Sequence, residues 1–287
     1  MIDERQWRLL REWLPGAEVV KDHSWGLVGT TVLELRHDGL RYVAKAGDEN
    51  DHHIARELRA HREWLEPWTS RGRAPQLVQA DAGANLLLTR YLPGELVEGG
   101  EHELLPDTYF QAGELLAQFH HQFAIDDEEF EAREKKKTLD ALGKPHRITS
   151  ELAKHLRAEV ETWPTPKMRL VPTHGDWQPR NWLVHRGVVS VIDFGRADLR
   201  PALTDFGRLA AQQFRQNPAL ESAFLHGYGT DPRDPDAWHR NRVREAIGTA
   251  VWAYQVHDEP FEQQGHEMLA EALADAPSGL APETDET

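Results

Sequence analysis

Short runs of β-branched and apolar residues dominate the first 92 positions, after a brief amphipathic helix that ends near Pro15 and Gly16. Such runs, separated by turn-forming residues, are typical of β-strands. They occupy residues 18–20, 30–36, 41–46, 77–79 and 85–89. His37-Asp38-Gly39 joins the second run to the third as a hairpin turn. The pattern predicts an antiparallel sheet of five strands.

One longer helix interrupts this β-rich stretch. From Asp51 onward, residues that suit a single helix face recur at three- and four-residue spacing: Ile54, Leu58, His61 and Leu65. Pro67 and the polar residues 70–73 end the helix. The turn-forming pair Pro93-Gly94 then marks a boundary, so residues 1–92 are expected to form one lobe.

Beyond that boundary the three- to four-residue period of helices takes over. Helices are predicted over residues 109–123, 148–160, 203–214, 219–228, 238–256 and 261–273. Residues 126–137 run acidic and then basic, which is typical of a solvated loop or helix face. A small hairpin, 182–184 with 188–192, lies inside this half. The fold class is therefore α+β, with a helical lobe at 93–273 and a flexible tail at 274–287.

Composition excludes several classes of protein. The 287 residues are 39 % apolar and 28 % charged, which is ordinary for a soluble globular chain. No window offers the roughly 18 consecutive apolar residues of a membrane span, and Met1 opens onto charged sequence and not a signal peptide. The protein is expected to be cytoplasmic. The absence of cysteine excludes disulfides, thiolate catalysis and Cys-ligated metal sites.

The net charge of -15 limits the choice of partners. A chain this acidic repels nucleic acid and attracts cationic small molecules. Solubility alone is an equally good explanation of the charge. Neither nucleic acid nor a membrane is expected as a partner, and the protein is expected to be a monomer or a homodimer.

Three polar side chains stand at the spacing that phosphoryl transfer requires. His174-Gly175-Asp176 is followed after four residues by Asn181, and Asp193-Phe194-Gly195 begins twelve residues later. The chemistry needs one carboxylate for the proton of an acceptor hydroxyl. It also needs a carboxamide and a second carboxylate that hold Mg²⁺ against nucleotide phosphates. Each residue alone is consistent with an ordinary turn, but together they favour phosphoryl transfer.

This arrangement resembles the aminoglycoside phosphotransferase family, whose catalytic loop carries glycine between the histidine and the aspartate. The resemblance covers roughly residues 17–260. It implies a bilobal, protein-kinase-like fold that uses ATP, with GTP left open, and Mg²⁺. It also implies Asp176 as the catalytic base or acceptor-orienting carboxylate, Asn181 and Asp193 as magnesium ligands, and His174 as a buried organiser of the loop.

The family also requires a lysine on the third strand for the α- and β-phosphates, and Lys45 stands there. An acidic residue on the following helix must hold that lysine in place. Glu57 and Glu63 are the candidates, and six residues turn a helix by about 240°, so only one of them can face Lys45. We expect Glu57 to be the partner.

Nucleotide recognition leaves weaker traces. Residues 24–30 lie where backbone amides should cover the phosphates, with Ser24 and Thr30 as hydroxyl donors, but only two glycines occur there. An ordinary hairpin loop is the alternative. By position, Arg90 and Leu92 correspond to the hinge between the lobes, where main-chain groups would bind the adenine edge.

The acceptor site of the family lies between the catalytic loop, a helical insertion near residues 126–163 and the last helices. Acidic residues in those elements would favour a substrate with ammonium groups; the alternative is that they are solvated helix faces. They are Asp126, Asp127, Glu128, Glu129, Glu131, Asp258, Glu259, Glu262 and Glu267. Asp176 with Asp258, Glu259 and Glu262 forms the expected substrate-binding set. Asp205 is expected to brace the catalytic loop.

The sequence therefore predicts an ATP-dependent O-phosphotransferase acting on a hydroxyl of a small, cationic molecule. Inactivation of an antibiotic is the leading role, with an aminoglycoside first and a cyclic peptide or other basic antibiotic second. A metabolic kinase for choline, homoserine or an amino sugar would carry the same motifs. A nucleotide-binding pseudoenzyme is a further alternative, although Lys45, Asp176, Asn181 and Asp193 are all retained. A protein kinase is disfavoured because the loop lacks arginine and no A-P-E follows Asp193.

Overall fold

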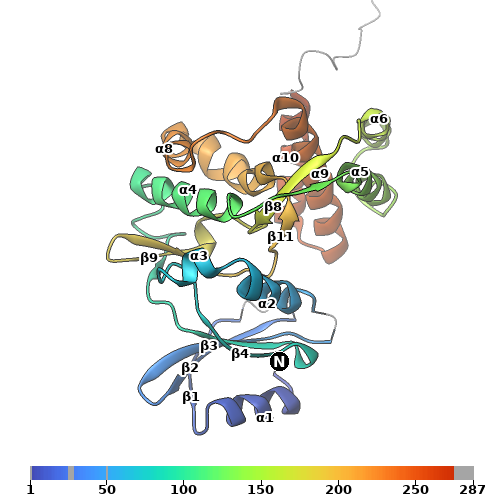
Figure 1. Cartoon of the computed structure of the whole chain (residues 1–287). Helices are drawn as coiled ribbons and strands as arrows, with labels where there is room; N and C mark the ends of the chain where they lie inside the picture. The colour runs from blue at the N-terminus through green and yellow to red at the C-terminus, as the bar shows by residue number, and fades with distance from the viewer. Residues whose placement is uncertain (1, 25–28, 50, 275–287) are drawn as a thin grey trace, which may run out of the picture. The chain divides into compact units, whose positions relative to one another are not determined.

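The computed structural model describes residues 2–24, 29–49 and 51–274 (Figure 1). The chain forms two compact units. The first comprises Met1–Phe123, Val171–Arg200 and Gln212–Thr230, and the second comprises Ala124–Leu170, Pro201–Ala211 and Asp231–Thr287. The first unit thus contains both the strand-rich N-terminal part and the segment with the phosphotransfer motifs.

A five-stranded antiparallel sheet is the centre of the first unit, as the sequence predicts. Its strands are β1 (Glu18–Asp22), β2 (Thr31–His37), β3 (Leu40–Ala46), β4 (Leu77–Asp81) and β5 (Leu86–Arg90). Their order across the sheet is β1-β2-β3-β5-β4. The β2–β3 hairpin turns at Asp38 and Gly39, both of which have positive φ, as a tight turn demands.

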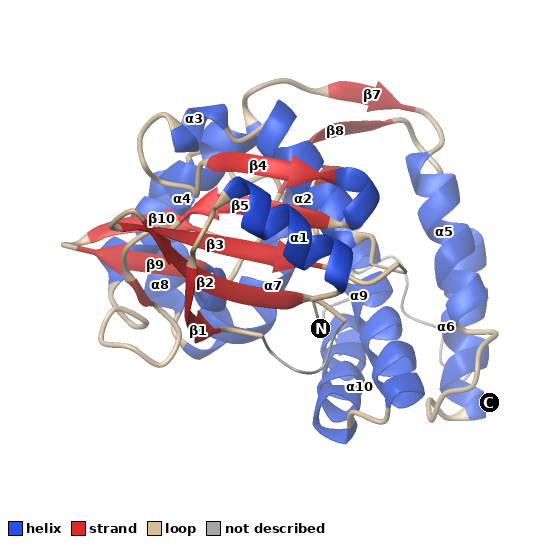
Figure 2. Cartoon of the chain, turned by 90° about the horizontal axis from the view of Figure 1, so that it is seen from below, coloured by secondary structure: helices blue, strands red, loops and turns tan. Residues whose placement is uncertain are grey.

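Two helices cover opposite faces of this sheet (Figures 1 and 2). Helix α1 (Glu4–Trp13) begins with a capping box between Asp3 and Gln6. Leu10 and Leu14, at the end of this helix, pack on alternate residues of the strands. These strand residues include Leu33, Leu35, Tyr42, Ala44, Leu86 and Leu88. Because side chains alternate along a strand, Lys45 points to the other face, where α2 (His53–Glu63) lies.

The rest of the first unit is mainly helical. It contains α3 (Glu66–Thr69), a 3₁₀-turn (Ala82–Ala84), α4 (Pro106–His120) and α8 (Pro218–Tyr228). Helices α4 and α8 approach closely because glycines face backbone at the crossing, Gly113 against Phe224 and Gly227 against Phe110. Strands β6 (Glu95–Leu96), β9 (Trp182–His185) and β10 (Val188–Val191) form a small sheet in the order β10-β9-β6.

Four helices make up most of the second unit: α5 (Phe130–Ala141), α6 (Ser150–Thr162), α9 (Pro235–Val256) and α10 (Glu259–Ala274). Their shared core includes Leu156, Val160, Val243, Ile247 and Leu269. Helix α10 lies along α9, where Gly265 meets the backbone of Ala250. Among the described residues, no helix combines the length and the apolar composition that crossing a membrane requires.

The structure corrects several predicted elements. The hairpin at 182–192 gains β6 as a third strand. The predicted helix at 203–214 is a succession of a 3₁₀-helix (Ala202–Phe206), α7 (Gly207–Leu209) and a π-helix (Ala210–Phe214), so it is helical throughout but not one α-helix. Residues 126–137, expected as a solvated loop or helix face, end a short strand and then enter α5, so the helix alternative is confirmed from Phe130 onward.

Three further strands have no counterpart in the sequence-based assignment. Strand β8 (Met168–Thr173) pairs with β7 (Ile125–Asp127) and with β11 (Asp198–Arg200). β8 contains Pro172, which weakens a strand signal, and its two partners are only three residues long. Such short strands form because a distant partner supplies their hydrogen bonds, and local sequence does not reveal that partner.

Candidate active site

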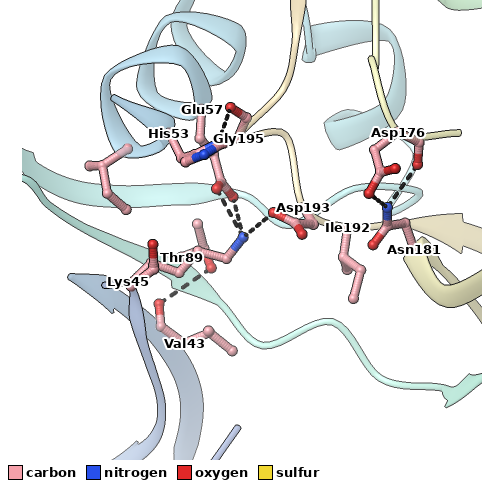
Figure 3. A network of polar contacts seen from close by, with 12 residues as sticks. Val43, Lys45, His53, Glu57, Thr89, Asp176, Asn181, Ile192, Asp193 and Gly195 are labelled. Carbon is pink, nitrogen blue, oxygen red and sulfur yellow. Dashed lines mark hydrogen bonds and ion pairs between the residues drawn. The ribbon is translucent and has the colours of Figure 1, made fainter. Parts of the chain in front are cut away.

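Lys45 joins two carboxylates that are far away in sequence. Its Nζ lies 2.9 Å from each carboxylate oxygen of Glu57 and 3.0 Å from Oδ1 of Asp193 (Figure 3). The side chains of Lys45 and Glu57 are only 15 % and 5 % exposed, whereas that of Asp193 is 53 % exposed. Glu63, the alternative partner on the same helix, is exposed. The Lys45 ammonium group is therefore held by the buried carboxylate of Glu57 and lies beside the more accessible carboxylate of Asp193.

Local backbone geometry determines the position of Asp193, the third member of the group that includes Lys45 and Glu57. Asp193 has φ of 68°, in the left-handed region that few non-glycine residues adopt. Phe194, which follows it, is fully buried and packs against His61 and His174. His53, at the start of α2, donates from Nδ1 to the carbonyl oxygen of Gly195 at 2.9 Å. These contacts fix the turn that aims Asp193 at Lys45.

Lys45, Glu57 and Asp193 shift one another's pKa values. Burial alone would lower the pKa of Lys45, but Asp193 and Glu57 outweigh it and the pKa is raised. The Lys45 ammonium group lowers the pKa of Asp193 to about 2, although solvent around this half-exposed carboxylate screens part of the attraction. Burial raises the pKa of Glu57, and Lys45 opposes that shift. Lys45 therefore stays cationic and Asp193 anionic near neutral pH.

Asp176 is the centre of a second cluster. Oδ1 accepts a hydrogen bond from Gln178 Nε2 at 2.6 Å, and Oδ2 accepts from Arg180 at 2.7 Å and from Asn181 Nδ2 at 3.0 Å. Asn181 Nδ2 also donates to the main-chain oxygen of Asp176 at 2.7 Å. Asp176 is only 4 % exposed. The carboxylate is thus held in one orientation by its own loop.

The residues before Asp176 show why glycine stands in the loop. His174 is fully buried; its Nδ1 accepts from the Asp176 amide and its Nε2 donates to the Ile192 carbonyl. Gly175 has φ of 78°, and a Cβ at this position would collide with the carbonyl of Arg196. A side chain is excluded there by both conformation and space.

Asn181 and Asp193 have the chemistry of magnesium ligands. Because Asn181 directs its Nδ2 at Asp176, its carboxamide oxygen receives no hydrogen bond from the described residues. Asp193 uses Oδ1 for Lys45, and its Oδ2 likewise receives no hydrogen bond from that part of the chain. Mg²⁺ prefers such oxygen donors and usually completes its octahedron with water and substrate phosphates. The two side chains fit this role.

The structure describes only some of the residues expected to contact the nucleotide. Trp25–Val28, the centre of the proposed phosphate loop, lie outside the described residues. Ser24 Oγ accepts from the Val32 amide, whereas the Thr30 hydroxyl donates to Asp51 and so has no proton left for a phosphate. The Arg90 amide donates to the Gln76 carbonyl, and the Arg90 side chain bonds to the Tyr42 hydroxyl. Leu92 follows β5 in a segment without regular structure.

The acidic residues expected to bind a cationic acceptor lie largely in the second unit, and several are paired within it. Glu262 is buried and accepts from Arg147 at 3.3 Å, and Glu259 lies 3.8 Å from the same arginine. Asp258 accepts from the Phe261 amide at the start of α10. The remaining internal pairs are Asp126 with Lys167, Asp127 and Glu129 with Arg133, and Glu131 with Arg240 and Arg244. Much of this negative charge is thus neutralised by the unit itself.

Three contacts in the first unit were not anticipated from the sequence: those of Gln178, Arg180 and His53. Gln178 and Arg180 stand two and four residues after Asp176, at positions the motif leaves variable. Both residues lie within four positions of Asp176, close enough along the chain for their side chains to reach its carboxylate. The spacing could therefore have suggested these contacts. The contact of His53 with Gly195 spans 142 residues and has no local signal.

Comparisons with known proteins identify the family and the fold. The sequence profile of the phosphotransferase enzyme family matches residues 18–244. No curated protein matches the chain in sequence. A thermostable mutant of the aminoglycoside phosphotransferase APH(4)-Ia, in ternary complex with AMP-PNP and hygromycin B, is similar with a TM-score of 0.65 at 12 % identity. That match covers 93 % of this chain and 97 % of the other.

Two further solved structures are similar. Choline kinase LicA from Streptococcus pneumoniae has a TM-score of 0.63 at 13 % identity, covering 96 % of this chain and 100 % of that chain. Spectinomycin phosphotransferase APH(9)-Ia, in complex with ADP and spectinomycin, has a TM-score of 0.62 at 12 % identity, covering 95 % and 98 %. At these identities the similarity establishes the fold.

Fold and family together define a small-molecule phosphotransferase with the bilobal, kinase-like α+β fold. The chain belongs to the phosphotransferase enzyme family, because the sequence profile of that family matches most of the chain.

Proposed function

We propose that this protein transfers the γ-phosphoryl group of ATP to a hydroxyl of a small, cationic molecule, with Mg²⁺ as cofactor. The observation that carries the proposal is the position of Lys45, bonded to both Glu57 and Asp193 within the unit that also holds Asp176 and Asn181. This is the set of groups that phosphoryl transfer requires. Residues 1–92 would serve as the nucleotide-binding lobe, and the proposed site of the reaction is the cytoplasm.

Each residue has a separate task in this mechanism. Lys45 neutralises the α- and β-phosphates, and Glu57 keeps its ammonium group in place. Asn181 and Asp193 would hold Mg²⁺, which would stabilise negative charge on the phosphate oxygens. Asp176 orients the acceptor hydroxyl and takes its proton. The hydroxyl oxygen then bonds to the γ-phosphorus, and ADP leaves with the electron pair of the broken P–O bond.

The remaining nucleotide contacts come mainly from the backbone. Main-chain groups of Arg90 and Leu92 are proposed to bind the adenine edge. Because the Arg90 amide already donates to Gln76, its carbonyl is the group left for this task. Ser24 accepts from the Val32 amide and hydrogen-bonds through its side chain to the Asp22 carboxylate, so it would have to give up the Asp22 contact to donate to a phosphate oxygen.

An antibiotic with amino groups is the proposed acceptor, and an aminoglycoside is the first choice. The net charge of -15 favours a cationic substrate. Similar structures bind hygromycin B and spectinomycin. Asp258 and Glu259 are the proposed partners of its ammonium groups. Glu262 is buried against Arg147, which favours a structural role for it over the substrate role expected from sequence.

A metabolic alcohol kinase is the second candidate. The similarity to choline kinase LicA favours it, with a coverage as complete as that of the antibiotic kinases. Both candidates use the same phosphotransfer groups and differ only in the acceptor.

A phosphoryl-transfer assay with Mg-ATP tests the proposal directly. The panel would hold aminoglycosides, spectinomycin, basic cyclic peptides, choline, homoserine and amino sugars, each followed by ADP release and mass spectrometry of the product. We expect a gain of one phosphoryl group on one class. Tight nucleotide binding without any phosphorylated product would favour a pseudoenzyme and contradict the proposal. A thermal-shift screen with Mg-AMP-PNP guides the choice of acceptors, because a bound ligand stabilises the folded state.

A further inference from the structure

Arg180 stands apart from the other groups around Asp176. It lies in the 3₁₀-turn Pro179–Asn181, and its guanidinium donates to Oδ2 of Asp176 at 2.7 Å. Its side chain is 37 % exposed. Gln178 and Asn181, the other donors to this carboxylate, are only 5 % and 4 % exposed. The cluster thus combines two buried, neutral donors with one charged and accessible donor.

Orientation of Asp176 does not require this arginine. Gln178 holds Oδ1 at 2.6 Å, and Asn181 holds Oδ2 and the main-chain oxygen. Two neutral, buried donors are therefore enough to hold the carboxylate, and the guanidinium adds a positive charge at an accessible position. The position of Arg180 therefore indicates a role other than holding Asp176 in place.

The charges of the site indicate what the role of Arg180 is. Lys45 is shared between Glu57 and Asp193, so one ammonium group faces two carboxylates. Among these described groups, together with Asp176 and Arg180, three carboxylates face two cations, and a nucleoside triphosphate would add further negative charge. Arg180 contacts the acceptor-orienting carboxylate, and in the proposed mechanism the γ-phosphoryl group must reach the hydroxyl held by that carboxylate.

We propose that Arg180 is a further catalytic residue, a cation supplied by the chain itself that contacts the γ-phosphoryl group during transfer. The inference rests on the proposed function. In the nucleotide complex the guanidinium turns from Asp176 to the phosphoryl oxygens, while Gln178 and Asn181 keep the carboxylate in place. An arginine suits this role because its planar donors match phosphate oxygens in pairs. Charge that spreads over these oxygens in the transition state is then stabilised where it develops.

Nucleotide binding tests this without knowledge of the acceptor. The affinities for Mg-AMP-PNP and Mg-ADP are measured by calorimetry for the wild type, Arg180→Gln, Asp176→Asn and the double variant. We expect Arg180→Gln to weaken AMP-PNP binding by about tenfold more than ADP binding, because only AMP-PNP has the γ group. The same selective loss is expected when Asp176→Asn is already present.

The Asp176→Asn background separates contact with phosphate from an effect through Asp176. A selective loss that occurs only while Asp176 is intact would overturn the proposal, as would equal losses for the two nucleotides or no loss. Arg180→Lys, which keeps the charge but not the paired donors, is expected to lie between the wild type and Arg180→Gln. A wild type that binds neither nucleotide would overturn the proposed function, and this inference with it.

Arg59→Gln is the matched control. Arg59 is 39 % exposed and donates to Asp198 at 2.6 Å, an ion pair comparable with that of Arg180 and Asp176. Its substitution is expected to leave the ratio of the two nucleotide affinities unchanged. A shift of that ratio equal to the one in Arg180→Gln would show a general effect of charge and contradict the proposal.

Discussion

Lys45 on β3 and Glu57 on α2 form a nearly buried ion pair in which both carboxylate oxygens lie 2.9 Å from the ammonium nitrogen. Burying the two charges separately would be costly, whereas the pair satisfies both. The pair also links the sheet to its covering helix and leaves Lys45 in contact with Asp193. Stability and the proposed phosphoryl transfer are therefore expected to depend on the same contact, and substitutions can separate the two effects.

Lys45→Met is expected to abolish phosphoryl transfer and to lower the free energy of unfolding by about 3–5 kcal/mol, because it leaves Glu57 as an unpaired buried charge. Adding Glu57→Gln should recover a large part of the stability but none of the activity. Urea unfolding and a transfer assay measure the two effects. A double variant no more stable than Lys45→Met would contradict the buried-charge explanation.

Asp176→Asn and Asp193→Asn should have different effects. Without the carboxylate that accepts the proton, Asp176→Asn is expected to lower kcat by about 10²–10⁴-fold. It should leave the affinity for Mg-AMP-PNP within about threefold of the wild type. Asp193→Asn changes a proposed magnesium ligand and a partner of Lys45, so it should weaken that binding as well. Calorimetry and steady-state kinetics distinguish them, and equal losses of binding would contradict the assigned roles.

His61 should make stability depend on pH. Its side chain is 1 % exposed, and neither ring nitrogen has a hydrogen-bond partner among the residues that the structure describes. Burial lowers its pKa from 6.5 to about 3. Between these values the unfolded chain binds a proton that the folded chain does not, so stability falls as the pH falls. The contribution is at most about 1.4 kcal/mol per pH unit.

His61→Phe is therefore expected to flatten the fall in unfolding free energy between pH 6.5 and about 4. Urea unfolding at several pH values measures this fall. His185→Gln, at an exposed position, serves as the control and should follow the wild-type curve. Identical curves for His61→Phe and the wild type would exclude a neutral, buried His61.

Gly113→Ala should destabilise the crossing of α4 and α8. Its new methyl group would meet the Phe224 carbonyl and lie 2.9 Å from the Tyr228 amide nitrogen. Such overpacking costs about 1–3 kcal/mol. Gly248→Ala in α9 is the control, since no atom lies within 4 Å of a Cβ there. It should stabilise the helix by about 0.5–1 kcal/mol. Thermal unfolding of both variants measures the contrast, and a stable Gly113→Ala would refute the close approach.

The sequence by itself determined the elements whose signals are local. Strand runs and the turn at Asp38 predicted the five-stranded sheet, because side-chain alternation and turn chemistry act over a few residues. The spacing of Asp176 and Asn181 placed both on one loop, where the carboxamide bonds to the carboxylate. The family profile rests on the same kind of pattern.

Tertiary structure alone decided the contacts between distant segments. The Lys45–Asp193 bond joins residues 148 positions apart, and the choice of Glu57 over Glu63 depends on how α2 rotates against the sheet. The pairing of acidic residues with Arg147, Arg240 and Arg244 altered the expectation for the acceptor. Spacing along the chain cannot specify such pairs, because ion pairs depend on distance and burial in space.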